Sequence, residues 1–157
     1  MINEALRFAV VSPSDLPALA RALQEAGLPC ADVAQPGRVF YAFEMGGQHI
    51  GYAGLEMYGP DALLRSVLVL PQQRRRGLGG QMVRQMEQLA RRAGIANLHL
   101  LTSDQTAFFE RIGYLPGQRM LAPGAIAATE QFRSLCPASA TYLRKHLGAQ
   151  PAGGPEQ

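Results

Sequence analysis

One stretch of the chain combines basic residues, glycines and the predicted start of a helix. An apolar run, Val67 to Leu70, ends at Pro71 and is followed by Arg74, Arg75, Arg76, Gly77, Leu78 and Gly79. The first turn of a helix carries unpaired N–H groups and a partial positive charge. Glycine lets a ligand approach the backbone closely, and arginine donates charge-assisted hydrogen bonds. The stretch therefore predicts an anion site of the size of a diphosphate, and a solvated basic turn is the alternative.

Two common phosphate loops do not agree with this stretch. No Lys-Ser or Lys-Thr pair follows the glycines, so the nucleotide P-loop is excluded. There is no G-x-G-x-x-G pattern either, which excludes the dinucleotide fingerprint.

The predicted elements place the basic turn between a meander and a helix. A first strand, 6–12, is followed by a helix that begins at Ser14 as N-cap and ends at Gly27. After a loop at 28–37, three strands are expected at 39–45, 50–58 and 63–70. Helical periodicity then predicts helices at 80–93, 104–112 and 123–134. Alternating patterns predict strands at 98–101, from Tyr114 onward and at 141–147. This order indicates an α/β (α+β) fold, a mixed sheet in which an antiparallel meander runs into a β-α-β unit flanked by helices.

Composition limits the class of protein. The chain has 157 residues, of which 47% are hydrophobic and 17% charged, as expected for one globular domain. We assign residues 1–147 to that domain and expect the Gly- and Pro-rich residues 148–157 to be a disordered tail. No apolar stretch is long enough for a membrane span, and the N-terminus has neither a basic leader nor a cleavage site.

The cysteines, the histidines and the net charge argue against a disulfide framework, a metal site and a nucleic-acid partner. Cys30 and Cys136 lie too far apart for a disulfide framework, and the three histidines show no metal-ligand spacing, so we expect no metal. Without a disulfide framework, a reducing cytoplasm is the default expectation. A net charge of +3 without a recognition helix argues against nucleic acid as a partner.

Two motifs resemble the GCN5-related N-acetyltransferase (GNAT) superfamily. Its acetyl-CoA loop is Arg/Gln-x-x-Gly-x-Gly/Ala after an apolar strand and a proline, and Arg74-x-x-Gly77-x-Gly79 agrees at every defined position. A second motif of that family ends in aromatic-x-x-x-Gly-aromatic, and Phe109-Glu-Arg-Ile-Gly113-Tyr114 agrees with it. The resemblance covers roughly residues 6–147. It implies the acyl-CoA N-acyltransferase fold, acetyl-CoA as cosubstrate, and direct attack of a primary amine on the thioester.

The resemblance also implies where acetyl-CoA binds. The pantetheine arm is expected along the backbone of Leu68, Val69 and Leu70, on the splayed fourth strand, and the diphosphate on residues 74–79. The N–H of Leu68 would meet the developing oxyanion. Thr102 stands where many relatives have an asparagine that contacts pantetheine.

The candidates for proton transfer and substrate binding are fewer. Glu56 is the first candidate for the base, with Glu44 or a water relay as alternatives. Phe109 occupies the position of the tyrosine that usually protonates the leaving thiolate; Tyr58, Ser103 and Tyr114 are weak substitutes. Arg65, beside Ser66, could bind a substrate carboxylate or point outward into solvent.

Two finer resemblances concern the substrate. Leu100-Leu101-Thr102, Phe108-Phe109 and Gly113-Tyr114 resemble amino-acid N-acetyltransferases of the N-acetylglutamate synthase type. Segments 54–59, 62–66 and 134–140 resemble the small N-acetyltransferases of bacterial arsenic-resistance operons. These imply an amino acid, or an amino-acid-like toxicant, as acceptor. A non-catalytic module that binds coenzyme A and recognises a partner is the alternative, and an exposed sheet edge is compatible with a homodimer.

Overall fold

A tight hairpin organises the N-terminal strands. Gly46 and Gly47 both have positive φ angles, 59° and 80°, which L-residues rarely adopt and which match the turn between two right-twisted strands. The turn joins β2 (Arg38–Met45) to β3 (Gln48–Tyr58), and β1 (Leu6–Val10) pairs with β2 antiparallel. The computed structural model describes residues 5–148, so the predicted tail lies outside the described residues from 149 onward.

The described strands form one mixed sheet of seven, in the order β1-β2-β3-β4-β5-β7-β6. The remaining strands are β4 (Asp61–Val69), β5 (Asn97–Thr102), β6 (Leu115–Gly117) and β7 (Thr141–His146). β4 and β5 are parallel and are paired over Asp61–Leu63, whereas β7 is antiparallel to both β5 and β6. This is the mixed sheet with an antiparallel meander that the sequence predicted.

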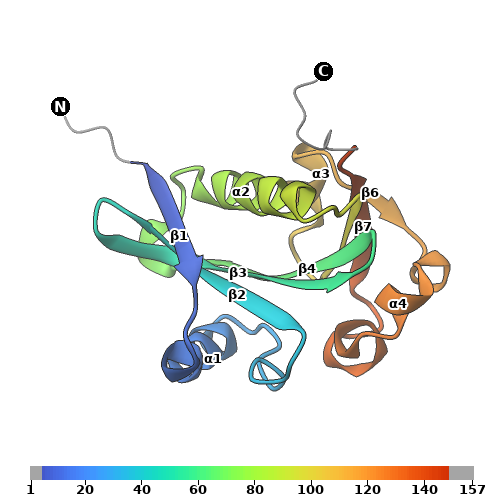
Figure 1. Ribbon diagram of the computed structural model, residues 1–157, viewed down its shortest axis with the longest axis horizontal. Coiled ribbons are helices and arrows are strands. Elements are labelled where there is room, and N and C mark those ends of the chain that lie inside the picture. Colours follow the sequence, from blue (N-terminus) through green and yellow to red (C-terminus); the bar gives the residue numbers. More distant parts are fainter. Residues whose placement is uncertain (1–4, 149–157) are drawn as a thin grey trace. The chain divides into compact units, whose positions relative to one another are not determined.

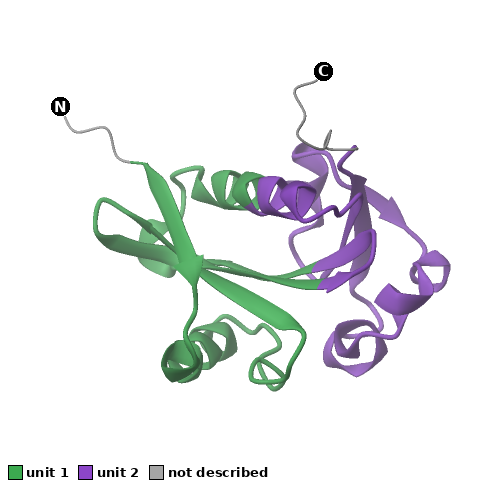
Figure 2. Cartoon of the chain, in the orientation of Figure 1, with its two compact units in different colours: residues 1–56, 64–85 green, residues 57–63, 86–157 purple. Residues whose placement is uncertain are grey.

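The chain divides into two compact units (Figure 2). One unit extends up to Glu56 and includes Leu64–Gln85, and the other includes Met57–Leu63 and the chain from Met86 onward. Within the first unit, α1 (Leu16–Glu25) and the start of α2 (Leu78–Arg92) lie on opposite faces of the strands (Figure 1). Leu19 and Leu23 of α1 pack with Phe40, Tyr52 and Leu68 into a buried apolar cluster.

The second unit has its own core and short helices. Leu63, Ile126, Phe132 and Tyr142 form a buried apolar cluster there. The helices are α3 (Thr106–Arg111) and α4 (Gly124–Ala127). No helix among residues 5–148 is both long and apolar enough to cross a membrane.

The structure corrects two boundaries at helix ends. Ser14 does not cap a helix: it lies in a 3-10 turn, Pro13–Asp15, and its hydroxyl oxygen is hydrogen-bonded to that of Ser12, 3.1 Å away. The predicted helix at 123–134 is broken after Ala127 and continues as one π-helical turn, Gln131–Leu135. Thr129 accounts for the break, because its hydroxyl donates to the Ile126 carbonyl and accepts from the Phe132 N–H, replacing backbone pairing.

Gly51 of β3 allows a close approach of two backbones. A Cβ at this position would overlap the carbonyl oxygen of Leu68, and that atom belongs to backbone. We expect Gly51→Ala to lower the free energy of unfolding by about 1–3 kcal/mol, the usual cost of overpacking. Urea unfolding measures it, with Gly124→Ala as control, because a Cβ at Gly124 would meet open space. A change in Gly51→Ala no larger than in the control would contradict this placement.

Candidate functional site

The basic turn has a backbone conformation suited to an anion. Arg75 and Gly77 both have positive φ angles, 68° and 71°, and α2 begins immediately afterwards at Leu78. Turn conformations that include left-handed residues can direct successive N–H groups toward one side, as in an anion-binding nest. A Cβ at Gly77 or Gly80 would meet nothing within 4 Å, so the protein's own atoms leave this space open. These residues therefore fit a diphosphate.

The arginines of the turn differ in what they contact. Arg74 donates from Nε to the carbonyl of Val69, 3.1 Å away, which ties the turn to the end of β4. Arg76 donates from Nη1 to Oε1 of Gln73 at 2.6 Å. Arg75 is exposed, with no hydrogen bond to another side chain within residues 5–148. Arg74 therefore holds the turn, whereas Arg75 can reach a bound anion.

The end of β4 is partly committed to the protein itself. The N–H of Leu70 donates to the carbonyl of Ile50 at 2.9 Å, and its carbonyl accepts from the N–H of Gln73 at 2.8 Å. Leu68 is 5% exposed and packs in the apolar cluster. Of the three residues predicted along the pantetheine arm, Leu70 thus has its amide donor already in use within the protein.

A buried ionic cluster surrounds Arg65 in the middle of β4. Its Nη1 donates to Oδ2 of Asp32 at 2.6 Å and to Oε2 of Glu56 at 2.8 Å, and its Nη2 donates to Oδ1 of Asp32 at 2.7 Å. Nε contacts the hydroxyl of Ser66 at 3.2 Å. The guanidinium also lies 5.3 Å from the centre of the Phe40 ring. Most of the donors predicted for a substrate carboxylate are therefore used by the protein's own carboxylates.

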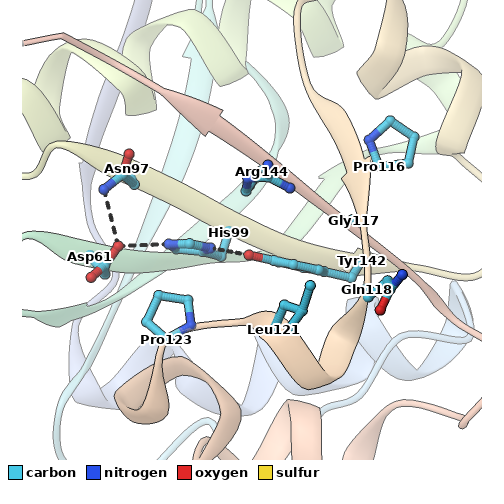
Figure 3. A pocket seen from close by; sticks show the side chains of 10 residues that line it. All are labelled: Asp61, Asn97, His99, Pro116, Gly117, Gln118, Leu121, Pro123, Tyr142 and Arg144. Atoms are coloured by element: carbon cyan, nitrogen blue, oxygen red, sulfur yellow. Dashed lines mark hydrogen bonds and ion pairs between the residues drawn. The ribbon is translucent and has the colours of Figure 1, made fainter.

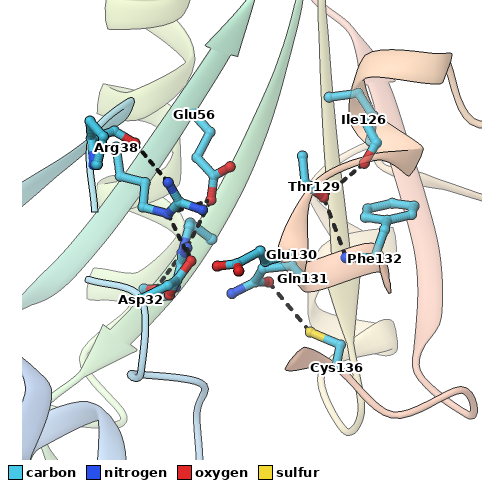
Figure 4. A network of polar contacts seen from close by, with 12 residues as sticks. Asp32, Arg38, Glu56, Ile126, Thr129, Glu130, Gln131, Phe132 and Cys136 are labelled. Atoms are coloured by element: carbon cyan, nitrogen blue, oxygen red, sulfur yellow. Dashed lines mark hydrogen bonds and ion pairs between the residues drawn. The ribbon is translucent and has the colours of Figure 1, made fainter. Parts of the chain in front are cut away.

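Arg38, the first residue of β2, completes the cluster (Figure 4). Its Nε lies 2.7 Å from Oδ2 of Asp32 and 3.5 Å from Oε2 of Glu56. Two carboxylates and two guanidiniums thus lie together in the ionic cluster. The Glu56 side chain is fully buried, and that of Arg38 is 10% exposed. Glu56, the predicted base, is consequently an ion-paired carboxylate rather than a solvated one.

Ser66 has an unusual backbone. Its φ of 59° is in the left-handed region, which is uncommon for residues other than glycine and costs on the order of 1–3 kcal/mol. Arg65 contacts the Ser66 hydroxyl, so the strained residue and the ionic cluster are adjacent on β4. Backbone strain held in this way is typical of functional sites.

Asp32 should make stability depend on pH. Burial alone raises the pKa of Asp32, but the hydrogen bonds and charges of Arg65 and Arg38 outweigh it and hold the pKa below its ordinary value of 3.8. A lowered folded-state pKa stabilises the protein above the unfolded pKa, and this stability is lost as pH falls below about 3.8 toward the folded value. We expect Asp32→Asn to be less stable than wild type at pH 6, by urea unfolding, and to lose less stability than wild type below pH 3.8. Parallel loss in both proteins would contradict this role.

The predicted residues of the second unit have mainly structural contacts there. Thr102 accepts a hydrogen bond at Oγ1 from the N–H of Gln105, 3.0 Å away, at the start of α3. Phe109 is 5% exposed and packs edge-on against Tyr114 with ring centres 5.5 Å apart. The Tyr114 hydroxyl donates to Oε2 of Glu87 at 2.8 Å. Burial, with the charge and hydrogen bond of Glu87, raises the pKa of Tyr114 far above its ordinary value, so it is a poor proton donor.

Sequence analysis missed Asp32 and Arg38. Asp32 is the only acidic residue in the loop at 28–37, and a single acid among prolines was the available signal. Its partner Arg65 lies 33 residues away, a pairing that no local pattern indicates. No group of three or more potential metal ligands occurs among residues 5–148, and Cys30 and Cys136 are both free thiols.

Comparison with known proteins identifies the fold and the family. The chain resembles N-acetylglutamate synthase from Neisseria gonorrhoeae, solved with coenzyme A and N-acetyl-glutamate: 18% identity, TM-score 0.75, 92% of this chain and 35% of that one. It also resembles Rv2747 from Mycobacterium tuberculosis, solved with CoA and NLQ (17% identity, TM-score 0.70, 89% and 98% covered). A GNAT-family acetyltransferase from Staphylococcus aureus gives 15% identity, a TM-score of 0.69, and 92% and 100% covered.

The chain spans about a third of the length of the N-acetylglutamate synthase. No protein with a curated description matches it in sequence. The model of the acetyltransferase (GNAT) domain matches residues 36–116, from the loop before β2 to β6. That segment contains the basic turn, Glu56, Arg65 and the second motif. The protein therefore belongs to the GNAT acetyltransferase family and has its acyl-CoA N-acyltransferase fold.

Proposed function

We propose that this protein transfers an acetyl group from acetyl-CoA to the primary amine of a small molecule, either an amino acid or an amino-acid-like toxicant. The observation that carries the proposal is the turn at 74–79, where left-handed residues and open space precede a fifteen-residue helix. The two solved relatives that contain coenzyme A support this choice of cosubstrate.

Residues of the first unit would hold the cosubstrate. Backbone N–H groups of the turn, together with Arg75, would bind the diphosphate. The backbone of Leu68 and Val69 would align the pantetheine arm, and the Leu68 N–H would stabilise the oxyanion. The resemblance to the GNAT superfamily also implies Thr102 and Phe109 as contacts of acetyl-CoA, and this stays a prediction. Acetyl-CoA supplies an acetyl thioester that is activated toward attack by an amine.

The ionic cluster is the proposed source of the base. An ammonium must lose a proton before its nitrogen can attack, and Glu56 is the carboxylate that we assign to accept it. Arg65 donates to both Glu56 and Asp32, so a substrate carboxylate would have to compete with Asp32 for it. We therefore assign Arg65 and Ser66 as positioning residues that fix Glu56, in place of direct ligands of the substrate.

The acceptor class rests on resemblance. One solved relative is a synthase that holds N-acetyl-glutamate, which supports an amino acid as the acceptor. The similarity of segments 54–59, 62–66 and 134–140 to arsenic-resistance acetyltransferases stays a prediction. A panel of glutamate, aspartate, phosphinothricin-like and arsenical amino acids, and polyamines would test the acceptor by release of free thiol from acetyl-CoA.

The outcomes of that panel separate enzyme from binding module. We expect thiol release above background hydrolysis with at least one amino-acid-like amine and a smaller rate with polyamines. If acetyl-CoA binds while every amine leaves the rate at background, the protein is a non-catalytic coenzyme A-binding module, and the proposed function is wrong.

A further inference from the structure

The second unit contains a cavity of about 590 Å³ that no part of the proposed acetyl transfer uses (Figure 3). The beginnings of β4 and β5, the β6–β7 pair and the segment after β6 provide its lining. Asp61 is the first residue of β4, whereas Leu68 and Val69, proposed to align the pantetheine arm, lie at the other end of that strand. The cavity size is in the usual range for a small-molecule site.

A buried hydrogen-bond relay fixes one carboxylate at this cavity. The Tyr142 hydroxyl lies 2.7 Å from Nδ1 of His99, and Nε2 of His99 lies 2.8 Å from Oδ1 of Asp61. Asn97 donates from Nδ2 to the same Oδ1 at 3.2 Å. His99 is 2% exposed and Tyr142 3% exposed. An ionised carboxylate can only accept, so Nε2 donates to Asp61, and in a neutral ring Nδ1 accepts from Tyr142.

The relay leaves half of the carboxylate open. Both donors reach Oδ1, and no residue within 5–148 donates to Oδ2 of Asp61. The Asp61 side chain is 16% exposed, as expected for a carboxylate at the wall of a cavity. Replacing a buried ion pair by apolar residues of similar volume is often neutral or stabilising, so stability alone does not account for this relay. The relay thus holds Asp61, a lining residue, by one oxygen and leaves the other without a protein donor among residues 5–148.

Arg144 provides the opposite charge on the same wall. It lies directly opposite His99 in the β5–β7 register and is exposed, and it forms no ion pair with any described residue. A Cβ at Gly117 would lie 2.5 Å from Nη1 of Arg144, so glycine makes room for the guanidinium. Burial raises the pKa of Tyr142. The charge of Arg144 lowers this pKa and the charge of Asp61 raises it, so the charges of both residues act on the Tyr142 hydroxyl.

Three apolar residues and the polar Gln118 complete the lining. The apolar ones are Pro116, Leu121 and Pro123 (Figure 3). Leu121 is 73% exposed, so its side chain is accessible to a ligand in the cavity. A ligand that contacts Asp61, Arg144 and the apolar residues needs a cationic group, an anionic group and an apolar group close together.

We propose that this cavity binds a free α-amino acid with an apolar side chain, whose ammonium group contacts Asp61 and whose carboxylate contacts Arg144. The apolar side chain lies against Pro116, Leu121 and Pro123. The site is separate from the acetyl-transfer residues and requires no acetyl-CoA. It gives the second unit a binding activity of its own.

Titration of ¹⁵N-labelled protein with L-leucine, followed by NMR without acetyl-CoA, tests the proposal. Saturable shift changes are expected at β5, β7 and the residues after β6. Asp61→Asn and Arg144→Gln should each weaken binding about tenfold or more, as for loss of a charged hydrogen bond. Leucinamide, which lacks the carboxylate, and N-acetyl-leucine, which lacks the ammonium, should weaken it similarly.

Matched controls separate recognition from folding. Asp104→Asn and Arg111→Gln remove the same charges from exposed positions of the same unit and should bind as wild type does. Arg144 is exposed, so its variant keeps the test valid if Asp61→Asn is unstable. Glu56→Gln should also bind L-leucine normally, so failure of acetyl transfer would leave this result unaffected. No saturable shift up to about 10 mM, or unchanged binding in Arg144→Gln, would overturn the proposal.

Discussion

Replacing Arg65 with methionine is expected to lower the free energy of unfolding by about 3–5 kcal/mol, the largest stability effect that we predict. The guanidinium holds two carboxylates, Asp32 and Glu56, at 2.6–2.8 Å in a site where its own side chain has no exposed surface. Methionine preserves much of the volume but leaves Arg38 as the only one of the two cluster arginines beside these carboxylates. Urea unfolding at neutral pH measures the change.

A matched substitution shows whether burial of the arginine causes the predicted loss of stability in Arg65→Met. Arg7→Met removes an arginine from the exposed face of β1 and should change stability by less than about 0.5 kcal/mol. Acidic pH gives a second check, because Arg65 contributes to the lowered pKa of Asp32, and protonation of Asp32 should narrow the gap in stability between Arg65→Met and wild type. If Arg65→Met and Arg7→Met were equally stable at neutral pH, the cluster would not have the energetic role assigned to it.

The second large effect concerns catalysis: Glu56→Gln is expected to lower kcat about 100-fold or more with the best acceptor amine, since a positioned base contributes about 10²–10⁴-fold. Glutamine has the same shape and can still accept a hydrogen bond from Arg65, but it cannot remove a proton. The affinity for acetyl-CoA should not change. Steady-state thiol release as a function of pH measures kcat, and its dependence on acetyl-CoA concentration shows whether the affinity for acetyl-CoA has changed.

The pH dependence distinguishes a base from a merely structural glutamate. As pH approaches the pKa of the acceptor amine, solvent removes the proton and the defect of Glu56→Gln should shrink. A structural defect would persist at every pH. Glu44→Gln is the control, because Glu44 is an exposed glutamate of β2 and was the alternative base. Equal activity of Glu56→Gln and wild type, or a larger loss in Glu44→Gln, would show that Glu56 is not the base.

The sequence predicted the sheet well because its signals are local. Two glycines at 46 and 47 determine the β2–β3 turn, and Gly94, with a φ of 87°, ends α2 as expected. The basic turn was identified in the same way, since its arginines and glycines are adjacent in the chain. In such local patterns, the residues that form the feature are neighbours in the sequence, so their types and spacing can be recognised without a structure.

The ionic cluster could not be predicted in the same way. Asp32 belongs to an irregular loop, and its contact with Arg65 joins positions 33 residues apart. Alternation along β4 would have allowed Arg65 to point outward, and the left-handed Ser66 interrupts that alternation. The break of the predicted helix at Thr129 has a similar origin, because side-chain hydrogen bonds there replace the backbone ladder.

Binding of acetyl-CoA at the turn 74–79 is the claim on which the proposed function depends. Gly77→Val places a branched side chain at a positive φ and in the open space beside α2, and Gly94→Val creates the same strain, also in open space, at the other end of that helix.

Calorimetric titration with acetyl-CoA compares wild type with these two variants. Saturable binding by wild type and Gly94→Val, together with affinity at least about tenfold weaker in Gly77→Val, is the predicted result. Equal affinity in all three proteins, or no binding by wild type, would contradict the account.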